Sequence, residues 1–303
     1  MVIRQNLSLL PVLRATWKMD IVLALTCFAT YVLHAYIIPD AIRIPGTVVA
    51  ILGPAIAFFV GFSNNQAYDR WWEARTIWGS LVNDCRSWAR NILSYTRESE
   101  VEYGEINQIK KRMILRQISF VYALNKDLRR KEHGYFEKYL TVAELAKVRL
   151  ETNLSNAILT LNAQDTQKLS SIKAIDEFRF MQLNELITAF TDHMGRSERI
   201  RNTVFPTSYI YFTQLFIWVL VVFTTLILAD SIGIWSVLIG WIMGFVFHIT
   251  HQNGMLIMDP FDEIPSGIPL DQLCRTIEIN LLEMLGETDI PQPIKPVNDE
   301  YIL

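Results

Sequence analysis

Cysteine and charge are both scarce in this sequence of 303 residues. The three cysteines, Cys27, Cys85 and Cys274, lie far apart and form no Cys-x-x-Cys pair, which argues against a disulfide framework or a zinc ribbon. Only 19% of the residues are charged, whereas 51% are hydrophobic and the mean hydropathy is +0.21. A chain that is disordered, collagen-like or coiled-coil along its whole length is therefore excluded.

The sequence also lacks the common signatures of catalysis and of nucleic-acid binding. No Walker loop, dinucleotide-binding fingerprint, nucleophile elbow or His-Glu-x-x-His motif occurs. Basic residues in the middle of the chain alternate with acids, which argues against a nucleic-acid-binding surface. Strand-like alternation and internal repeats are essentially absent. We therefore expect an all-α fold, no enzymatic activity, no cofactor and no nucleic-acid partner.

Long apolar stretches are present instead, at 21–38, 44–62, 208–229 and 232–249. None of them contains a charged residue. At 1.5 Å per residue, each is about 27–33 Å long as a helix, which matches the thickness of a bilayer core. They pair as two hairpins joined by Pro39–Arg43 and by Asp230-Ser231. The sequence therefore predicts a multi-pass membrane protein with four spans.

The net charge of −3 conceals two regions of opposite sign. Of the 28 lysines and arginines, 22 fall within 69–203 together with 18 acids, so this region carries a net charge of +4. Residues 250–303 contain ten acids and two bases, a net charge of −8. Basic residues beside short loops and span ends mark the cytoplasmic side of a membrane protein. Both termini and the middle region are therefore expected in the cytoplasm.

The polar regions show the spacing of amphipathic helices. Apolar residues recur at such intervals in 70–95, 105–131, 136–150, 173–194 and 270–286. We expect cytoplasmic helices within 70–203 and 250–288, followed by a proline-containing tail without regular structure at 289–303. The whole chain, 1–303, is thus predicted to be one protomer with four spans and a cytoplasmic helical layer.

The second apolar stretch has the composition of a pore-lining segment. It contains two prolines and three glycines, which a span tolerates where helices pack closely or line a cavity. Pro54, Phe58 and Phe62 lie at i, i+4 and i+8 and share one helical face, and a polar run that includes Asn64 and Asn65 follows. Apolar rings beside polar ones suit a narrow constriction that opens into a wet vestibule. Packing against another span produces the same spacing and is the more common cause of it.

Two motifs resemble those of the bestrophin family. The first is Arg70-Trp71-Trp72-Glu73-Ala74-Arg75, followed by Trp78-Gly79 and Val82-Asn83. The second is Asp259-Pro260-Phe261, followed by the segment Pro269–Leu281. The first motif is similar to the signature after the second span of bestrophins, and the second is similar to the bacterial branch of the family. The resemblance covers nearly the whole chain in order and length.

This resemblance implies a homopentamer around one central ion pathway in the inner (plasma) membrane of a bacterium, in contact with membrane lipid. It implies that Pro54, Phe58 and Phe62 line a narrow neck, with proline in place of the usual aliphatic residue. It also implies a cytoplasmic aperture at Phe205, where family members usually carry isoleucine or valine. The expected function is the passage of monovalent ions. Chloride or another anion is favoured weakly over sodium or another cation, because aromatic ring edges are positive.

Calcium binding does not transfer safely from the animal members of the family. Their run of consecutive acids is reduced here to Asp262 and Glu263, which Ile264-Pro265 interrupts. Calcium takes about six to eight oxygen ligands, and these two acids with Asp259 supply only part of such a shell. We therefore expect no bound metal ion. If calcium does bind, these three acids are its candidate ligands.

Two other functions stay open on the residues alone. A membrane-anchored scaffold or signalling protein would bind a partner through its cytoplasmic helices, and it predicts neither ion flux nor fivefold assembly. A membrane enzyme would use His248 and His251, which are spaced i, i+3, and it predicts bound metal. No carboxylate or cysteine lies at metal-ligand spacing from this pair, so packing at the span end is its more common role.

Overall fold

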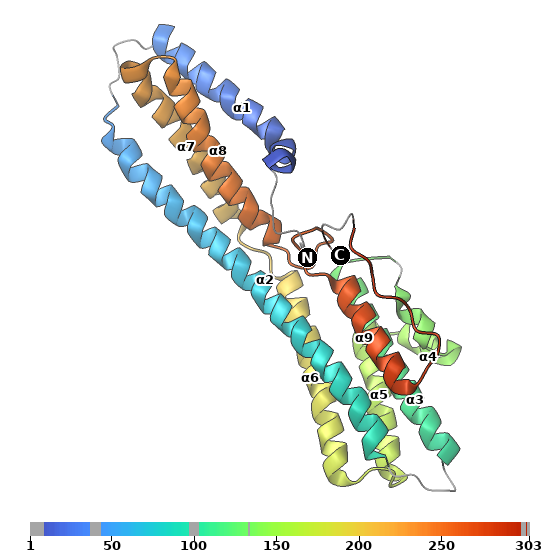
Figure 1. Ribbon diagram of the computed structural model, residues 1–303. Helices are drawn as coiled ribbons and strands as arrows, with labels where there is room; N and C mark the ends of the chain where they lie inside the picture. The colour runs from blue at the N-terminus through green and yellow to red at the C-terminus, as the bar shows by residue number, and fades with distance from the viewer. Residues whose placement is uncertain (1–8, 37–43, 97–102, 133, 298–300, 302–303) are drawn as a thin grey trace. The chain divides into compact units, whose positions relative to one another are not determined.

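Helices account for nearly all of the described structure (Figure 1). The computed structural model describes residues 9–36, 44–96, 103–132, 134–297 and 301. Its helices are α1 (Leu9–Tyr36), α2 (Thr47–Tyr95), α3 (Tyr103–Leu128), the 3₁₀ helix η1 (Tyr135–Tyr139), α4 (Val142–Val148), α5 (Leu154–Ser171), α6 (Glu177–Asn202), α7 (Thr207–Ile232), α8 (Trp235–Ile257) and α9 (Leu270–Leu285). Within these residues, β-type pairing is limited to an isolated bridge between Val297 and Tyr301. The prediction of an all-α chain is confirmed.

The chain forms two compact units. The span unit comprises the described residues up to Trp71 together with Val204–Asp259, and so contains α1, the first half of α2, α7 and α8. The polar unit comprises Trp72–Thr203 and the described residues from Pro260 onward, and so contains the second half of α2, α3 to α6 and α9. Each unit has a hydrophobic core of its own.

The span unit is held together by α1, α7 and α8, each of which packs against the other two. Leu23 and Cys27 of α1 form a buried cluster with Val221 of α7. A second cluster joins α2 to α7 through Ile56 and Val60. These contacts use one side of each helix, so a substantial part of the apolar surface of the span unit stays exposed, as expected of helices in lipid.

Glycines on α8 allow close approach of its neighbours. A Cβ at Gly240 would lie 2.1 Å from Thr225 Oγ1, and a Cβ at Gly244 would lie 2.8 Å from methyl groups of both Leu23 and Val221. Small residues at such contacts are a general device for packing helices in membranes, because they let side chains of the facing helix reach the backbone.

Among the residues that the structure describes, three helices are long and apolar enough to cross a membrane: α2, α7 and the Thr16–Tyr36 part of α1. The predicted fourth span coincides largely with α8, which contains no charged residue. α8 also contains three glycines, two histidines and the amides Gln252 and Asn253, and it is not among the three helices above. The count of four spans therefore remains a prediction.

The turn between α7 and α8 begins later than predicted. The predicted loop, Asp230-Ser231, is part of α7, which ends at Ile232. His34 Nε2 of α1 lies 3.1 Å from Asp230 Oδ1. The carboxylate of Asp230 therefore has a partner, and the backbone of Asp230 remains part of α7. Gly233 then makes the turn with φ of 58°, a left-handed conformation that glycine adopts without steric cost.

α2 is a single helix of 49 residues, about 73 Å long at 1.5 Å per residue. The sequence patterns instead predicted a span over 44–62 and a separate helix over 70–95. The polar run between them does not interrupt the helix, because it contains neither glycine nor proline. The side chain of Asn65 donates to Asp69 Oδ2, one turn further on, at 3.3 Å, and so does not compete for the backbone.

The polar unit has an aromatic core. The ring of Trp88 on α2 meets that of Phe190 on α6 edge to face, with 5.8 Å between centroids, and Phe120 on α3 lies 5.9 Å from the same ring. All three side chains are buried. Cys85 lies buried in the same unit, and burial raises the pKa of its thiol to about 12. The thiol is therefore protonated at neutral pH.

Sequence patterns missed α5 and merged two shorter helices. Asn, Gln, Ser and Thr dilute the apolar stripe of α5, yet Asn153 caps its first turn and starts the helix. The helix predicted over 136–150 is instead η1 followed by α4. Thr141 and Glu144 form a capping box that begins α4 as a new helix.

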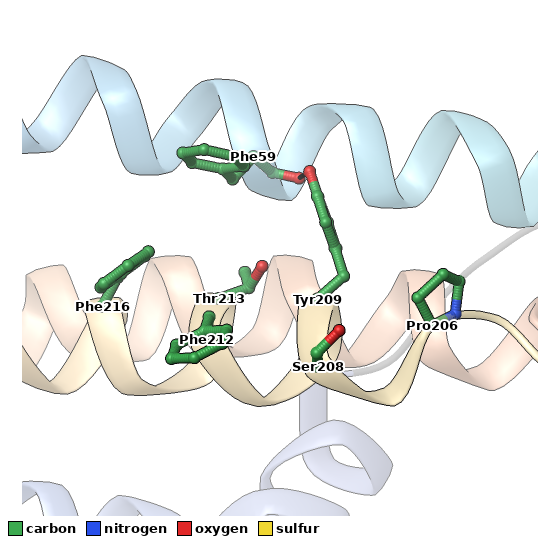
Figure 2. Close-up of a pocket in the computed structure, with 7 residues that line it drawn as sticks. All are labelled: Phe59, Pro206, Ser208, Tyr209, Phe212, Thr213 and Phe216. Carbon is green, nitrogen blue, oxygen red and sulfur yellow. Dashed lines mark hydrogen bonds between the residues drawn. The ribbon is translucent and has the colours of Figure 1, made fainter.

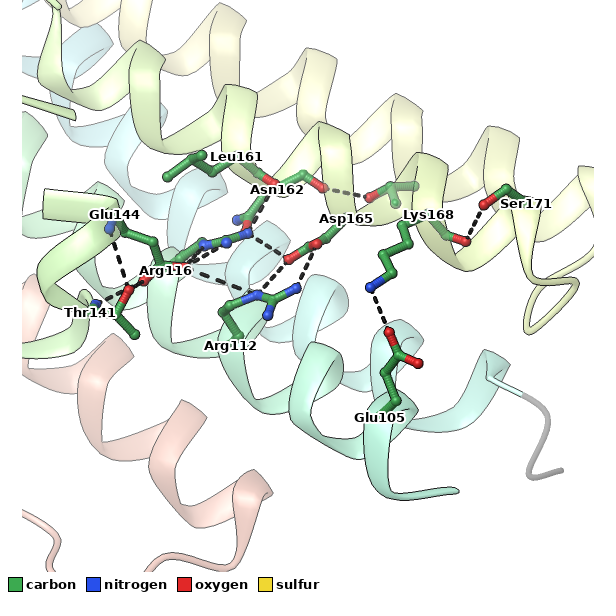
Figure 3. Close-up of polar contacts among 11 residues, drawn as sticks. Glu105, Arg112, Arg116, Thr141, Glu144, Leu161, Asn162, Asp165, Lys168 and Ser171 are labelled. Atoms are coloured by element: carbon green, nitrogen blue, oxygen red, sulfur yellow. Dashed lines mark hydrogen bonds and ion pairs between the residues drawn. The ribbon is translucent and has the colours of Figure 1, made fainter. Parts of the chain in front are cut away.

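A buried ion-pair network joins α3, α4 and α5 (Figure 3). Arg116 donates to Glu144 Oε1 and to Asp165 Oδ2, at 2.7 Å in each case. Arg112 binds both oxygens of Asp165 at 2.8 and 2.7 Å. Burial alone would raise the pKa of Glu144, but two hydrogen bonds from Thr141 and the charge of Arg116 lower it below its ordinary value. The carboxyl group of Glu144 is therefore ionised at neutral pH despite its burial.

Candidate functional site

One face of α2 in the span unit is apolar and exposed. The side chains of Phe58 and Phe62 are 70% and 45% exposed, and Pro54 is exposed as well. Ile56 and Val60 lie on the opposite side of the helix, are 2% exposed, and pack against α7. The stripe of proline and phenylalanine therefore stays largely exposed within the span unit, and it is available to line a pathway or to meet another chain.

The exposed face of α2 continues in both directions from this stripe. Ile51, closer to the start of the helix, is 71% exposed, and the exposed residues Asn65 and Asp69 follow the stripe at helical spacing. Asn64 turns to another side, where its Nδ2 donates to the carbonyl of Thr250 on α8 at 3.0 Å. Of the two predicted vestibule residues, only Asn65 shares the exposed face.

Aromatic side chains of α7 meet α2 beside this face (Figure 2). The ring of Tyr209 lies 5.7 Å from that of Phe59 and 5.8 Å from that of Phe62, between centroids. Its hydroxyl donates to the backbone carbonyl of Phe59 at 3.1 Å. A cavity of about 460 Å³ adjoins these rings and is lined by Phe59, Pro206, Ser208, Tyr209, Phe212, Thr213 and Phe216.

Phe205, the predicted aperture residue, is half-buried at the start of α7. It precedes Pro206, the N-cap residue of that helix. The ring of Phe205 meets that of Tyr209 edge to face, with 5.6 Å between centroids. The structure thus brings the predicted aperture residue and the predicted neck residue Phe62 into contact with the same tyrosine.

The acids that the sequence offered as calcium ligands have other positions and partners. Asp262 accepts a hydrogen bond from Arg201 at 3.0 Å, and Glu263 lies 3.2 Å from Lys131 Nζ. Asp259 is half-buried and belongs to the span unit, whereas the other two belong to the polar unit. Ion pairs therefore neutralise two of the three carboxylates without a metal.

His248 and His251, the pair considered for a membrane enzyme, are buried near the end of α8. The side chain of His248 contacts that of Gln252, with 3.5 Å between their Nε2 atoms. Over the described part of the chain, no group of three or more His, Cys, Asp or Glu side chains is arranged to hold a metal ion. Both histidines are buried, as side chains that pack against neighbouring helices are.

Comparison with known proteins identifies the family. Residues 11–283 match the family described as Bacterial/Fungal Bestrophin protein. The chain belongs to this bestrophin family. It is 27% identical over 248 residues to the voltage-dependent anion channel-forming protein YneE of Escherichia coli, covering 82% of this chain and 79% of that protein. The corresponding Salmonella typhi protein is 29% identical over 243 residues, covering 80% and 77%.

Solved structures show the same fold. The chain is similar to a bacterial bestrophin homolog from Klebsiella pneumoniae, with a TM-score of 0.80 and 20% sequence identity, covering 88% of this chain and 97% of the other. The resemblance deduced from the two motifs is confirmed.

The bestrophin motifs lie at positions that stabilise the fold. In the first motif, Arg70 Nε donates to the carbonyl of Met258 at 3.1 Å and so ties α2 to the end of α8, while Trp78 is fully buried. In the second motif, Cys274 and Ile277 are fully buried on α9. The motif residues named here therefore hold the fold together, whereas the exposed face of α2 is formed by other residues.

Ile51, Asp69 and Tyr209 are candidate site residues that sequence patterns did not single out. The first two continue the helical spacing of the stripe, so following it beyond the apolar run could have found them. No local pattern marks Tyr209, because its contact with Phe59 joins residues 150 positions apart. Only the packing of α7 beside α2 brings Tyr209 next to the exposed stripe.

The contact between α2 and α8 leads to a prediction about stability. A Cβ at Gly254 would lie 2.0 Å from Asn64 Oδ1 and 3.2 Å from Asn64 Cα. Gly254→Ala is therefore expected to destabilise the protein by about 1–3 kcal/mol, because the helices must separate and Asn64 loses its bond to Thr250. Thermal unfolding in detergent measures the loss.

The matched control for Gly254→Ala is Gly61→Ala on α2, where nothing lies within 4 Å of the added Cβ. This control should leave the melting temperature unchanged or raise it slightly, since alanine favours a helix over glycine. Equal losses in the two variants would contradict the assignment of Gly254 as a contact point.

Proposed function

We propose that this bestrophin is an anion channel, formed by five copies of the chain around a central pore that the exposed face of α2 lines. The observation that carries the proposal is the exposed stripe of Pro54, Phe58 and Phe62, opposite the packed face of the same helix. Fivefold symmetry would turn this stripe into three stacked apolar rings. The Escherichia coli and Salmonella typhi relatives are named voltage-dependent anion channel-forming proteins, which supports the choice of ion.

A neck built from such rings acts as a hydrophobic barrier. Water leaves a narrow apolar constriction readily, and ions pass only when the constriction widens or wets. The edges of phenylalanine rings carry partial positive charge and stabilise a passing anion without a fixed cation. No charged residue occurs in α2 between Ile51 and Phe62, so the rings dominate the environment of the ion there.

In this proposal α1, α2, α7 and α8 cross the inner membrane of a bacterium. Both termini and the polar unit lie in the cytoplasm, as the distribution of basic residues indicates. The five Phe205 side chains form a second, cytoplasmic constriction. The larger phenylalanine ring makes this aperture narrower than one formed by isoleucine or valine.

Reconstitution tests the proposal directly. The purified protein in liposomes with unequal KCl concentrations on the two sides is expected to give a current that reverses close to the chloride equilibrium potential. Light scattering in detergent is expected to give five chains per particle. A monomer or dimer without ion flux would overturn the proposal and favour the membrane-anchored scaffold, whereas reversal at the potassium potential would overturn the choice of anions alone.

Asp69 is expected to limit the preference for anions. Its carboxylate lies on the exposed face of α2, one turn after Asn65. Two charges a few ångströms apart in water interact by about 1 kcal/mol, which corresponds to about fivefold in an equilibrium. Asp69→Asn is therefore expected to raise the chloride-to-potassium permeability ratio by about two- to fivefold.

The shift of the reversal potential measures this change. Glu151→Gln makes the same change of charge at an exposed position outside α2 and should leave the ratio unaltered. An unchanged ratio in Asp69→Asn would remove Asp69 from the proposed pathway.

A further inference from the structure

In the polar unit, α2 is exposed on one side only. The exposed side chains recur at intervals of three, four or seven residues, so they lie on one face of the helix. They are Trp72, Thr76, Ser80, Asn83, Arg90 and Ser94. Those from Thr76 onward form what we call the polar face of α2. Trp78, Cys85 and Trp88 lie between them in the sequence and are fully buried in the core of the unit.

Helical spacing joins the polar face to the exposed stripe of the proposed neck. Trp72 follows Asp69 by three residues, and Asp69 follows Asn65 by four. All three positions therefore lie on the same side of one uninterrupted helix. A pathway lined by this side of α2 changes from apolar rings to hydroxyl and amide side chains along the helix.

Arg90 carries the charge of this face. From Trp72 to the end of α2, it alone among the exposed residues is charged. The acids of this stretch are half-buried and face α6 instead. Glu73 Oε1 accepts a hydrogen bond from Arg199 at 2.7 Å, and Asp84 Oδ2 lies 2.7 Å from a ring nitrogen of His193. The polar face therefore has a net positive charge.

The guanidinium group of Arg90 is available to an anion. Among the residues that the structure describes, none forms an ion pair or a side-chain hydrogen bond with this group. The neighbouring cation Arg86 differs, since its Nε donates to Asn280 Oδ1 of α9 at 2.9 Å. A guanidinium group also keeps its charge throughout the pH range of a folded protein.

We infer that Arg90 is a specificity-determining residue, which attracts chloride to the cytoplasmic part of the pathway. This inference rests on the proposed channel function and deepens it. Five copies of the chain would place five guanidinium groups around one axis, and rings of arginine or lysine favour anions in pores. Asp69 lies nearer the neck and has the opposite charge, so the two residues shift the preference between anions and cations in opposite directions.

Single-channel conductance and the reversal potential of the reconstituted protein test this role. Near 0.1 M KCl, Arg90→Gln is expected to lower the chloride conductance and the chloride-to-potassium permeability ratio by about two- to fivefold each, the range for loss of one nearby charge in water. In 1 M KCl the conductances of variant and wild type should agree within about 1.5-fold, because the Debye length falls from about 10 Å to about 3 Å.

Two further variants separate the charge of Arg90 from its shape and from the net charge of the protein. Arg90→Lys keeps the positive charge and is expected to behave as the wild type does. Lys147→Gln is the matched control, because it removes the same charge at an exposed position of α4. This control should leave both readouts unaltered at either salt concentration.

The results distinguish the inference from the function on which it rests. Absence of ion flux in the wild-type protein would overturn the channel proposal. Normal wild-type flux, combined with unchanged conductance and permeability ratio in Arg90→Gln, would overturn this inference alone. A loss in Arg90→Gln that is equally large in dilute and in concentrated KCl, or that Arg90→Lys shares, would also overturn it, because the charge would not be the cause.

Discussion

Replacing both Phe58 and Phe62 with alanine is expected to raise chloride flux by about tenfold or more. The two side chains are the largest apolar groups on the exposed stripe of α2, and in a pentamer the change removes ten rings from the neck. A wider pore stays hydrated, so the barrier to ion entry falls. A reduction of 1.4 kcal/mol in that barrier is enough for a tenfold increase in rate.

The measurement is single-channel conductance in a planar bilayer, with liposome flux as a second readout. Leu25→Ala with Phe28→Ala is the matched control, because these α1 side chains are 62% and 51% exposed and belong to the proposed lipid-facing surface. The control should conduct as the wild type does. If the two double variants conduct alike, α2 does not form the neck.

The second large effect concerns stability. Arg116→Met is expected to lower the free energy of unfolding by about 3 kcal/mol, since it leaves the buried carboxylates of Glu144 and Asp165 without their shared cation. Arg112 still binds Asp165 through two hydrogen bonds, so the loss lies toward the low end of the range for broken buried pairs. Urea unfolding followed by tryptophan fluorescence measures it.

The effect of Arg116→Met should depend on pH. In the wild type the pKa of Glu144 is lowered from its ordinary 4.5 despite burial, by hydrogen bonds from Thr141 and by Arg116. A carboxyl with a lowered pKa stabilises the fold above its unfolded pKa, and this contribution disappears as pH falls through the folded value. The difference between wild type and Arg116→Met is therefore expected to shrink as pH falls below about 4.5.

Lys168→Met is the control for this second prediction. It removes an ion pair with Glu105 in the same unit, but both side chains are about half exposed, and exposed pairs contribute little to stability. Its urea midpoint should match that of the wild type at each pH. A loss in Arg116→Met that is no larger than the loss in Lys168→Met would show that the network is not needed for stability.

Local patterns predicted helices well where a hydrophobic stripe was strong and poorly where polar side chains determined the helix ends. The apolar stretches later found in α1, α2 and α7 were recognised because composition and length alone identify them. The unbroken passage of α2 through Ser63–Asp69 was missed, since polar residues there resemble a boundary. Asn153 and Thr141 start helices through capping bonds, which a search for apolar periodicity does not detect.

The candidate site divides in the same way. The stripe of Pro54, Phe58 and Phe62 was visible because helical spacing is a local property of the chain. Whether such a stripe is buried or exposed depends on which distant helices pack against it, and spacing alone favoured packing. In the structure α7 packs against Ile56 and Val60 and reaches the stripe through the ring contact of Tyr209 with Phe62, while Phe58 and Phe62 stay 70% and 45% exposed.

The sequence by itself determined the helical class, the apolar segments and, through two motifs, the bestrophin family. These properties follow from composition, periodicity and short runs of residues, which neighbours along the chain define. Only the tertiary structure decided that Asn64 binds α8 while Asn65 stays exposed, and that Tyr209 contacts both Phe62 and Phe205. Such contacts join residues up to 186 positions apart, so the packing of whole helices selects them.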